Sequence, residues 1–311
     1  MRLIYLDEPL DLPNPIVTIG QFDGVHLGHA SVFETVRLEA TSRCGTSIAI
    51  TFNPHPRTVI DEAKTLGILT SLEEKIWRLE ALGIDLLAVI PFDSSFRNLS
   101  PIMFVETYLV QKLCVRAIVM GYNHGFGKDR SGGLDTMRSL GRKYRFDVLS
   151  VPPILIDEEP VSSTRVRRLV SEGDMEGVGE VLGSGYPIIG EVIRGKSRGR
   201  KLGFPTANLK LDEPTKLLPP DGVYAAWVYL PERHKAVLNL GFRPTFQEKT
   251  RSLEVHLIDF NGDLYGKSLR VALCHRIRPE VQFKNQKELE KQIQHDLDAA
   301  RQTLSCKNRT L

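Results

Sequence analysis

The stretch TIGQFDGVHLGHA, residues 18–30, carries an apolar strand through a glycine-rich turn into the start of a helix. The strand pattern ends at Gly20, and the letters HLGH open the helix. A helix N-terminus attracts anions, because its free N–H groups and the positive end of the helix dipole face them. Gly24 and Gly28 allow the backbone to approach a ligand closely. The stretch therefore predicts a phosphate-binding turn at the carboxyl end of a strand.

His26 and His29 lie three residues apart, so they share one face of the first helical turn. There the two imidazoles can donate hydrogen bonds to phosphoryl oxygens as negative charge develops in a transition state. A lone histidine is more often a structural residue, but two histidines between glycines after a strand indicate a catalytic role. The HxGH pattern resembles that of nucleotidyltransferases, which act on the α-phosphate of ATP.

Strand and helix patterns alternate through the first half of the chain. Apolar, β-branched runs predict strands at 15–20, 46–52, 85–92, 115–121 and 146–151. Helical patterns lie between them, at 27–42, 71–82, 101–113 and 133–144. Ser71, with Glu74 three residues further on, predicts a capping box at the start of the second helix. Because the strands are almost wholly apolar, we predict a parallel sheet covered on both faces, in a doubly wound, Rossmann-like α/β domain.

Three further segments of this half carry polar or glycine-rich patterns. TFNPHPR (51–57) and GYNHGFGKDRSGG (121–133) each follow a strand end, which is where open α/β sheets place their ligands. In PVSSTRVRRLVSEGD (160–174), Ser163 and Thr164 precede an arginine-bearing helix. Hydroxyls, helix N–H groups and an arginine can hold a phosphate. A capped surface helix is the alternative for this segment on its own.

The second half has short strands separated by turns rich in Gly, Pro and Asp. We predict strands at 187–194, 222–230, 235–241, 252–260 and 268–277, followed by a helix at 286–304. Closely spaced strands without intervening helices predict an antiparallel barrel or sandwich. The helix has one apolar face, formed by Leu289, Ile293, Leu297 and Ala300.

GEVIRGKSRGRKLGFPTANL (190–209) is dense in glycine and basic residues. It can form a loop around an anion, and Thr206 and Asn208 offer the neutral oxygens that Mg²⁺ accepts as ligands. A basic loop that binds nucleic acid is the alternative. Glu254, expected on a strand beside His256, is a candidate general base for a hydroxyl that attacks the γ-phosphate of ATP. The alternative for an isolated glutamate on a strand is a solvated surface residue.

Composition and charge narrow the class of protein. The chain has 311 residues, enough for about two domains, with 41% hydrophobic and 25% charged residues, as in globular proteins. Residues 1–184 carry a formal charge of −5 and the remainder +8, which fits either nucleic acid or a polyanionic small molecule. No apolar run approaches a membrane span, and the N-terminus lacks the pattern of an export signal. We therefore expect a cytoplasmic protein.

The four cysteines, at positions 44, 114, 274 and 306, form no CxxC pair. A zinc ribbon or a thioredoxin-type redox site is therefore unsupported. Free thiols in a reducing compartment are the expectation.

Four motifs of the first half follow one another in the order GxFDGxHxGH, TFxPHP, the glycine-rich loop and SSTxxR. Together they resemble the FMN adenylyltransferase module of bacterial bifunctional riboflavin kinase/FAD synthetases. When the family's functional residues are carried over by position, the resemblance implies that His26 and His29 are the catalytic pair. It also implies a site for ATP and its phosphates formed by Gly20, Phe22, Asp23, Gly24, Gly28, Asn123, Ser163, Thr164 and Arg167. It implies a flavin site at Phe52, Pro54, His55, Pro56 and Phe126. The chain departs from the family pattern at Gln21, His124 and Gly125.

The second half resembles the riboflavin kinase module of the same family, and the motifs that carry this resemblance are RGRxLGFPTAN, NxGxRPTF, ExHLxDFxxDLYG and IRPE. The resemblance implies a six-stranded antiparallel barrel with a C-terminal helix and Glu254 as the catalytic base. It also implies that Thr206 and Asn208 hold Mg²⁺, that Arg276 and Arg278 help form the flavin site, and that ATP is bound by Gly195, Arg198, Gly199, Lys201, Gly203, Pro205, Thr206 and Asn208.

The resemblance implies a bifunctional enzyme with an adenylyltransferase domain at 1–183 and a kinase domain at 184–311. Riboflavin, FMN and ATP would be its small-molecule partners, Mg²⁺ its cofactor, and neither nucleic acid nor a membrane a partner. Two alternatives stay open at this stage. One is a kinase whose first domain adenylylates weakly, or runs in the reverse net direction, because of the altered loop around His124. The other is a flavin-binding or regulatory module whose basic half contacts RNA.

Overall fold

The computed structural model describes residues 1–56, 67–122, 124–128, 131–195, 199, 203–242 and 251–306, with the side chains of Phe242 and Cys306 left aside. The chain forms two compact units. The first consists of Met1–Ile68 and Lys75–Ser163, and the second of Leu69–Glu74 and Thr164–Leu311. The second unit thus includes a six-residue segment from the first half of the sequence.

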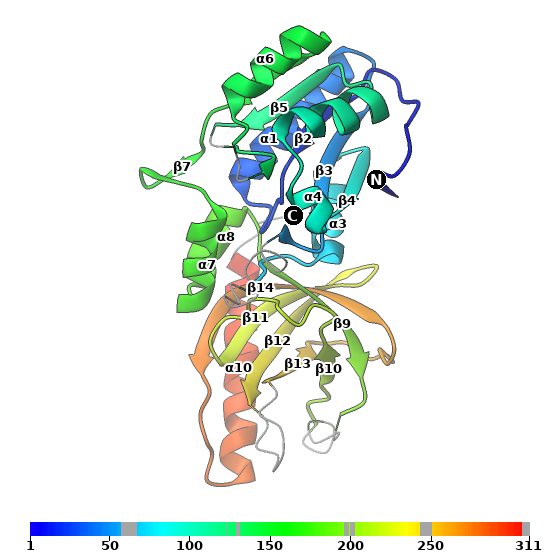
Figure 1. The fold of residues 1–311 in the computed structure, drawn as a ribbon. Helices are drawn as coiled ribbons and strands as arrows, with labels where there is room; N and C mark the ends of the chain where they lie inside the picture. The colour runs from blue at the N-terminus through cyan, green and yellow to red at the C-terminus, as the bar shows by residue number, and fades with distance from the viewer. Residues whose placement is uncertain are drawn as a thin grey trace. The chain divides into compact units, whose positions relative to one another are not determined.

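A six-stranded, wholly parallel sheet forms the centre of the first unit (Figure 1). Its strand order is β1-β4-β3-β2-β5-β6. The strands are β1 (Arg2–Tyr5), β2 (Ile16–Ile19), β3 (Ser47–Asn53), β4 (Leu86–Pro91), β5 (Ala117–Gly121) and β6 (Asp147–Val151). Successive strands run outward from β2 to β3 and β4, and the chain then crosses to β5 on the other side of β2. This reversal defines the topological switch point of a doubly wound sheet.

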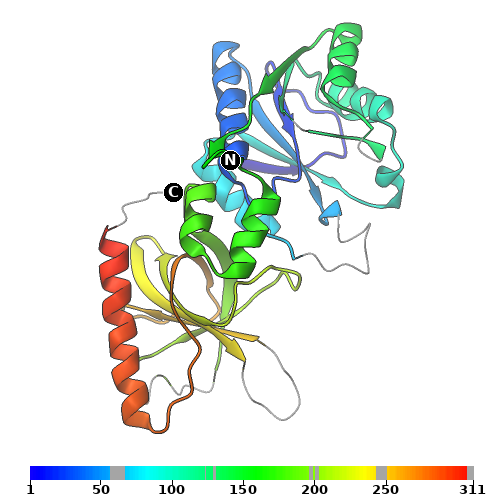
Figure 2. The ribbon, with the colours of Figure 1, turned by 90° about the vertical axis from the view of Figure 1, so that its left-hand side faces the viewer.

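Helices cover both faces of this sheet. The helical segments are α1 (Leu27–Ser42), α3 (Leu72–Ala81), α4 (Ser94–Arg97), α5 (Pro101–Phe104), the π-helix η1 (Val105–Lys112) and α6 (Leu134–Tyr144). The side chains of η1 and α6 pack in one core cluster with alternate sheet residues such as Val17 and Ile118. Figure 2 shows α1, in blue, and α6, in green, on opposite sides of the strands. The doubly wound architecture predicted from the sequence is confirmed.

Several local features of the first unit differ from the sequence prediction. The expected helix at 101–113 is a short α5 followed by η1, and the edge strand β1 was not predicted. A two-stranded hairpin, β7 (Leu155–Ile156) with β8 (Glu159–Pro160), also follows β6. Strands of two residues leave no alternation pattern in a sequence, so periodicity cannot indicate them.

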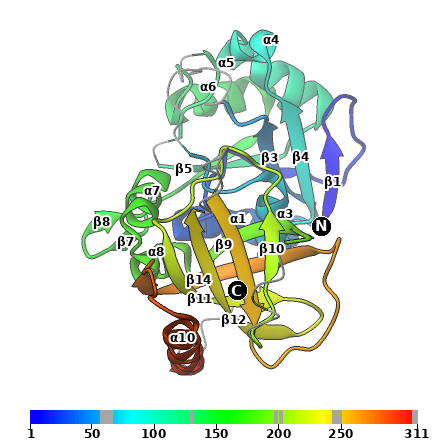
Figure 3. The same ribbon diagram turned by 90° about the horizontal axis from the view of Figure 1, so that it is seen from below.

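The second unit is built on a closed antiparallel barrel with the order β10-β13-β12-β11-β14-β9 (Figure 3). Its strands are β9 (Tyr186–Ile193), β10 (Ala207–Lys210), β11 (Gly222–Tyr229), β12 (Arg233–Phe242), β13 (Arg251–Leu257) and β14 (Ser268–Pro279). The six-stranded barrel is confirmed. The short β10 was not predicted from strand patterns, because it coincides with the PTANL motif.

Three of the helices whose bounds the structure gives belong with the barrel. They are α7 (Ser163–Glu172, from Thr164 onward), α8 (Met175–Leu182) and α10 (Gln286–Cys306). Leu297, Ala300 and Leu304 of α10 pack on Ala225 and Trp227 of β11, so the predicted apolar face closes over the outside of the barrel. Helix α8 was not predicted. It is capped by Asp174, whose carboxylate accepts from the N–H of Gly177 at 2.9 Å.

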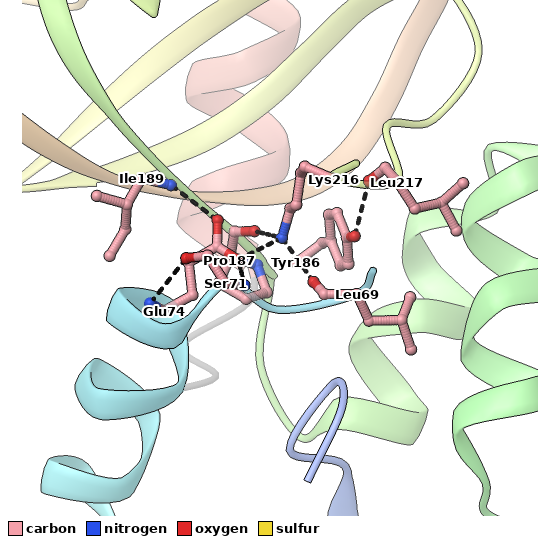
Figure 4. Close-up of polar contacts among 8 residues, drawn as sticks. All are labelled: Leu69, Ser71, Glu74, Tyr186, Pro187, Ile189, Lys216 and Leu217. Carbon is pink, nitrogen blue, oxygen red and sulfur yellow. Dashed lines mark hydrogen bonds and ion pairs between the residues drawn. The ribbon is translucent and has the colours of Figure 1, made fainter. Parts of the chain in front are cut away.

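A buried ion pair holds the segment Leu69–Glu74 within the second unit (Figure 4). Lys216 Nζ lies 2.5 Å from a carboxylate oxygen of Glu74, and each side chain is 2% exposed. The same ammonium donates to the carbonyls of Leu69 and Pro187, at 2.6 and 2.7 Å. Its charge also lies 4.3 Å from the centre of the Tyr186 ring. This lysine is therefore fully surrounded by acceptors.

The Glu74 carboxylate is equally well satisfied. It accepts from the backbone N–H of Ser71 at 2.9 Å and of Ile189 at 3.0 Å. The N–H of Glu74 in turn donates to Ser71 Oγ at 3.2 Å, which completes the predicted capping box at the start of α3.

Candidate active sites

The turn after β2 lies at the switch point of the parallel sheet, and its backbone is held in unusual conformations. Phe22, Gly24 and Val25 have φ values of 48°, 91° and 41°, in the left-handed region. A side chain on Gly20 would place its Cβ 2.7 Å from the Phe22 ring, so this glycine is required for the ring to fold back. The turn delivers His26 to the N-cap of α1.

His26 and His29 form a stacked pair at the start of α1. Their ring centres are 3.7 Å apart with 16° between the planes. His26 Nδ1 accepts from the backbone N–H of His29 at 3.3 Å, so it caps the helix and must be unprotonated there. The remaining ring nitrogen of a neutral His26 then carries the proton and can donate it to a ligand. The two residues predicted as a catalytic pair are thus brought together.

Burial keeps both imidazoles neutral. It lowers the pKa of His26 to about 4, against an opposing effect of the Asp23 carboxylate. It also holds the pKa of His29 well below its usual value, and the neighbouring His26, Lys75 and His124 add to this effect. At neutral pH the pair therefore acts through hydrogen-bond donors without carrying charge.

Other residues predicted for the phosphate site lie around this turn. Asp23 is buried, and His55 Nε2 lies 3.8 Å from its carboxylate. Ser163 Oγ donates to the carbonyl of Asp23 at 2.8 Å. A Cβ on Gly28 would come within 3.2 Å of the His26 ring, so the glycine leaves room for the imidazole. Asn123 lies outside the described residues.

Thr164 and Arg167, which the sequence placed in the same phosphate site, belong to the second compact unit. Both lie in the first turns of α7, where Thr164 is exposed and Arg167 is half-buried. Their role in a phosphate site stays a prediction.

A buried cation of the first unit, Lys75, was not predicted from the sequence. Lys75, on α3, is 4% exposed and donates to Thr51 Oγ1 of β3 at 2.9 Å. Its pKa is lowered to about 8 by burial, an effect that the Asp23 carboxylate partly opposes. In sequence, this lysine stands in the amphipathic pattern of a helix, where a charged residue is usually solvated. Only its burial reveals that it differs.

An aromatic cavity of about 460 Å³ opens next to the histidine turn. Of the residues predicted to bind flavin, Phe52, Pro56 and Phe126 line it, whereas Pro54 and His55 do not. Phe126 is held in place by two backbone hydrogen bonds with Gly132, of 2.9 and 3.0 Å. Further lining comes from side chains that the sequence did not single out: Phe92, Phe96, Arg97, Leu99 and Phe104.

The cavity has the dimensions and the apolar, aromatic walls that suit a planar ring system. His124 and Gly125, the two loop residues that depart from the family pattern, are part of its lining.

In the barrel, strand register brings the predicted kinase residues together. Glu254 of β13 pairs directly with Asn208 of β10 on one side and with Asn239 of β12 on the other. Thr206 Oγ1 donates to the Glu254 carboxylate at 3.3 Å. His256, two residues further along β13, has Nδ1 2.7 Å from the carbonyl of Pro205. A carboxylate, a hydroxyl and two amides are therefore gathered at one end of β10.

Glycines in the preceding loop are required by these neighbours. A Cβ on Gly195 would lie 2.1 Å from the Asn208 amide, and one on Gly199 would lie 2.3 Å from the carbonyl of Phe204. Gly203 differs, because no described atom lies within 4 Å of the place that a Cβ would take, and its φ of 83° is what favours glycine there. Arg198 and Lys201 lie outside the described residues.

The two arginines predicted for the kinase flavin site have structural partners. Arg278 forms a two-pronged ion pair with the buried Asp296 of α10, with nitrogen–oxygen distances of 2.8 to 3.1 Å. Arg276 donates to the carbonyl of Asp221 at 2.8 Å, while its Nε finds no acceptor among the described residues. Contact with flavin stays a prediction for both.

Within the part of the chain that the structure covers, no group of three or more His, Cys, Asp or Glu side chains is arranged to hold a metal ion. Among the same residues, no helix combines the length and apolar character needed to cross a membrane. Cys44, Cys114 and Cys274 are free thiols, as expected.

A stacked histidine pair at the switch point of a parallel α/β sheet, beside an aromatic cavity, defines a nucleotidyltransferase-like unit. A family model described as FAD synthetase matches residues 9–165, and one described as riboflavin kinase matches residues 182–304. The chain therefore combines two classes of ATP-dependent transferase.

Relatives cover nearly the whole chain. The bifunctional riboflavin kinase/FMN adenylyltransferase of Bacillus subtilis is 36% identical over 310 residues, which span 96% of this chain and 97% of the relative. That of Listeria monocytogenes is 34% identical over 304 residues, spanning 95% and 96%. A crystal structure described as a macrolide-efflux protein from Streptococcus pneumoniae is 28% identical, with a TM-score of 0.84, and covers 97% of this chain and 99% of its own.

The chain belongs to the bifunctional riboflavin kinase/FMN adenylyltransferase family. It is an ATP-using enzyme of flavin cofactor synthesis, which phosphorylates riboflavin to FMN and adenylylates FMN to FAD.

Proposed function

We propose that residues 1–183 carry out adenylyl transfer and residues 184–311 carry out phosphorylation of riboflavin. The observation that carries this division is the stacked His26–His29 pair, because it lies in the parallel-sheet unit, whereas Glu254 lies in the barrel. The ranges matched by the two family models support the same division.

In adenylyl transfer, a phosphate oxygen of FMN attacks the α-phosphorus of ATP, and pyrophosphate leaves. His26 and His29 donate hydrogen bonds to the phosphoryl oxygens, where negative charge grows in the transition state. The N-terminus of α1 adds its N–H groups and dipole. The isoalloxazine ring occupies the aromatic cavity lined by Phe52 and Phe126.

In the kinase reaction, Glu254 accepts the proton of the ribityl hydroxyl as that oxygen attacks the γ-phosphorus of ATP. The Thr206 hydroxyl and two amides, Asn208 and Asn239, surround this carboxylate. The Thr206 hydroxyl donates a hydrogen bond to the carboxylate and so helps to orient it toward the substrate hydroxyl.

The residues at the end of β10 fit Mg²⁺. The ion prefers hard oxygen ligands and keeps several waters, so the Thr206 hydroxyl and the Asn208 amide oxygen suit it, with substrate phosphates completing the shell. When bound, it would neutralise negative charge on the transferring phosphate. The tight packing of Asn208 against Gly195 would keep the amide in place for this role.

The basic excess of the second half is explained by binding of ATP and needs no nucleic acid. The proposed location is the cytoplasm, where riboflavin and ATP are available. A gel shift with nonspecific RNA at low salt tests the RNA-binding alternative, since such binding would weaken steeply as salt rises.

One experiment tests the division of activities. The purified chain is incubated with riboflavin, ATP and Mg²⁺, and the flavins are separated by chromatography over time. FMN should rise and then give way to FAD. Glu254→Gln should stop FMN formation while FAD still forms from supplied FMN, and His29→Ala should do the reverse. If either variant stopped both steps equally while staying folded, the proposed division would be wrong.

A further inference from the structure

Among the residues that the structure describes, two lysines are buried, Lys75 and Lys216. Their surroundings differ sharply, and the difference points to a ligand. Lys216 has a carboxylate, two carbonyls and an aromatic ring around its ammonium. Lys75, at 4% exposure, makes a single hydrogen bond within the described residues, to the neutral Thr51 hydroxyl. An ammonium has three N–H donors, so two of those on Lys75 find no acceptor within the described ranges of the chain. Burial of a charge with one neutral acceptor is unfavourable unless a ligand completes its shell.

A second incomplete group lies in the same site. His29 Nδ1 is buried and finds no hydrogen-bond partner in the part of the chain that the structure describes. The charge of Lys75 acts on the pKa of His29, so the two side chains lie within electrostatic reach of each other. An anion held between them would satisfy both groups, and the N-terminus of α1 would favour the same anion.

The charged and titratable groups around Lys75 do not replace such a ligand. Asp23 acts on Lys75 electrostatically, but no carboxylate of the described residues forms an ion pair with its ammonium. His26, His29 and His124 are the imidazoles facing the site, and Arg78 lies one turn further along α3, with Nη2 3.5 Å from the carbonyl of Val25. Lys75 is therefore a cation beside the histidine pair that lacks a full set of acceptors in the described part of the protein.

We propose that Lys75 is a further catalytic residue of adenylyl transfer, whose ammonium donates hydrogen bonds to the α-phosphoryl oxygens of ATP together with His29. This inference rests on the proposed function of the histidine pair. A phosphate oxygen of FMN forms the new bond to phosphorus, and the bond from phosphorus to the pyrophosphate oxygen breaks with its electron pair. Lys75 keeps its proton throughout and stabilises the negative charge on the non-bridging oxygens.

The test compares three variants in the full chain. Lys75→Met removes the charge at similar length, Lys75→Arg keeps it, and Thr51→Val removes only the protein acceptor. FAD formation from FMN and ATP gives kcat and KM. Riboflavin phosphorylation by the same sample reports an intact barrel unit, and a urea titration followed by Trp77 fluorescence in a Trp227→Phe background reports folding of the first unit. Lys75→Met should lower kcat for FAD formation by about 10²- to 10³-fold, as expected for loss of a transition-state donor, with KM for FMN within about threefold. The kinase rate should stay within about twofold of wild type.

Two further readouts separate a catalytic role from a structural one. Lys75→Arg should recover at least about tenfold of the lost rate, and Thr51→Val should lose less than about tenfold. In wild type, kcat/KM should fall as pH rises through about 8, where Lys75 loses its proton, and Lys75→Arg should lack this fall.

Retention of adenylyl transfer within about threefold in Lys75→Met would overturn the inference. Equal losses of rate in Lys75→Met and Lys75→Arg, with the fall of kcat/KM at alkaline pH unchanged in both variants, would also overturn it. That pattern would indicate that the lysine acts through packing and not through its charge. His29→Ala separates the two proposals. If it loses FAD formation while Lys75→Met keeps it, only the Lys75 inference fails, and if His29→Ala keeps it, the proposed site fails as a whole.

Discussion

Replacing Lys216 by methionine should destabilise the barrel unit by about 3 kcal/mol. Breaking one partner of a buried ion pair typically costs about 3–5 kcal/mol, because a charge is left buried without its counter-ion. The Glu74 carboxylate keeps two backbone donors, Ser71 and Ile189, so the lower end of this range applies. Methionine fills a similar volume, so cavity formation adds little.

The pair can be separated from its surroundings by a double-mutant cycle. Glu74→Gln alone leaves the Lys216 ammonium with the carbonyls of Leu69 and Pro187 and removes its counter-charge. The double variant is electrically neutral, so its loss should fall short of the sum of the single losses by about 1–3 kcal/mol. Lys210→Met, at an exposed position on β10, is the control and should change stability by less than about 0.5 kcal/mol.

The assay must report on the barrel alone, because a chain with two compact units need not unfold in one step. Trp227 lies on β11 and Trp77 on α3 in the other unit, so urea titrations followed by fluorescence are made in a Trp77→Phe background. Hydrogen exchange of peptides covering β9 follows the Ile189 amide directly. A loss below about 1 kcal/mol in Lys216→Met, or strict additivity in the double variant, would refute the reasoning.

Three further predictions concern the two sites. Gly195→Ala should reduce riboflavin phosphorylation with little effect on FAD formation from FMN, because its Cβ would collide with Asn208; equal kinase rates in wild type and variant would contradict this. The pKa of His26 is about 4 in the folded state and about 6.5 in the unfolded state, so the unfolded state binds more protons between these pH values. The free energy of unfolding of the first unit should therefore fall as the pH is lowered from 6.5 to 4, by about 3 kcal/mol at most. His26→Asn, which retains a capping side chain without titrating there, should flatten that fall in urea titrations followed by Trp77 in a Trp227→Phe background. His124→Phe should lower KM for FMN in adenylyl transfer by severalfold, since residue 124 lines the aromatic cavity and a ring there would stack on the flavin; an unchanged or higher KM would show that the departure from the family pattern is neutral.

Much of the local structure could be predicted from the sequence. The helix predicted at 27–42 has those bounds in the structure, and the Ser71–Glu74 capping box forms as expected. Both depend on residues a few positions apart, whose spacing alone fixes their relation. The HxGH pattern placed two imidazoles on one helical turn for the same reason.

The sequence also determined the class of each half, because periodicity of apolar residues records which faces of strands and helices are buried. It could not predict which strands are neighbours in the barrel beyond what the resemblance implied. The register that sets Glu254 between Asn208 and Asn239 also brings β10 beside β13, and these two strands are separated in the chain by β11 and β12.

Only the tertiary structure distinguished Lys75 from Lys216, and both from ordinary surface lysines. Lys75 meets Thr51 across 24 residues of sequence, and Lys216 meets Glu74 across 142. A lysine in a helical or loop pattern looks solvated in sequence, since its letter carries no record of what packs around it. Burial and the number of acceptors arise when distant segments close together, and these decide that one lysine is a structural partner and the other is set to meet a ligand.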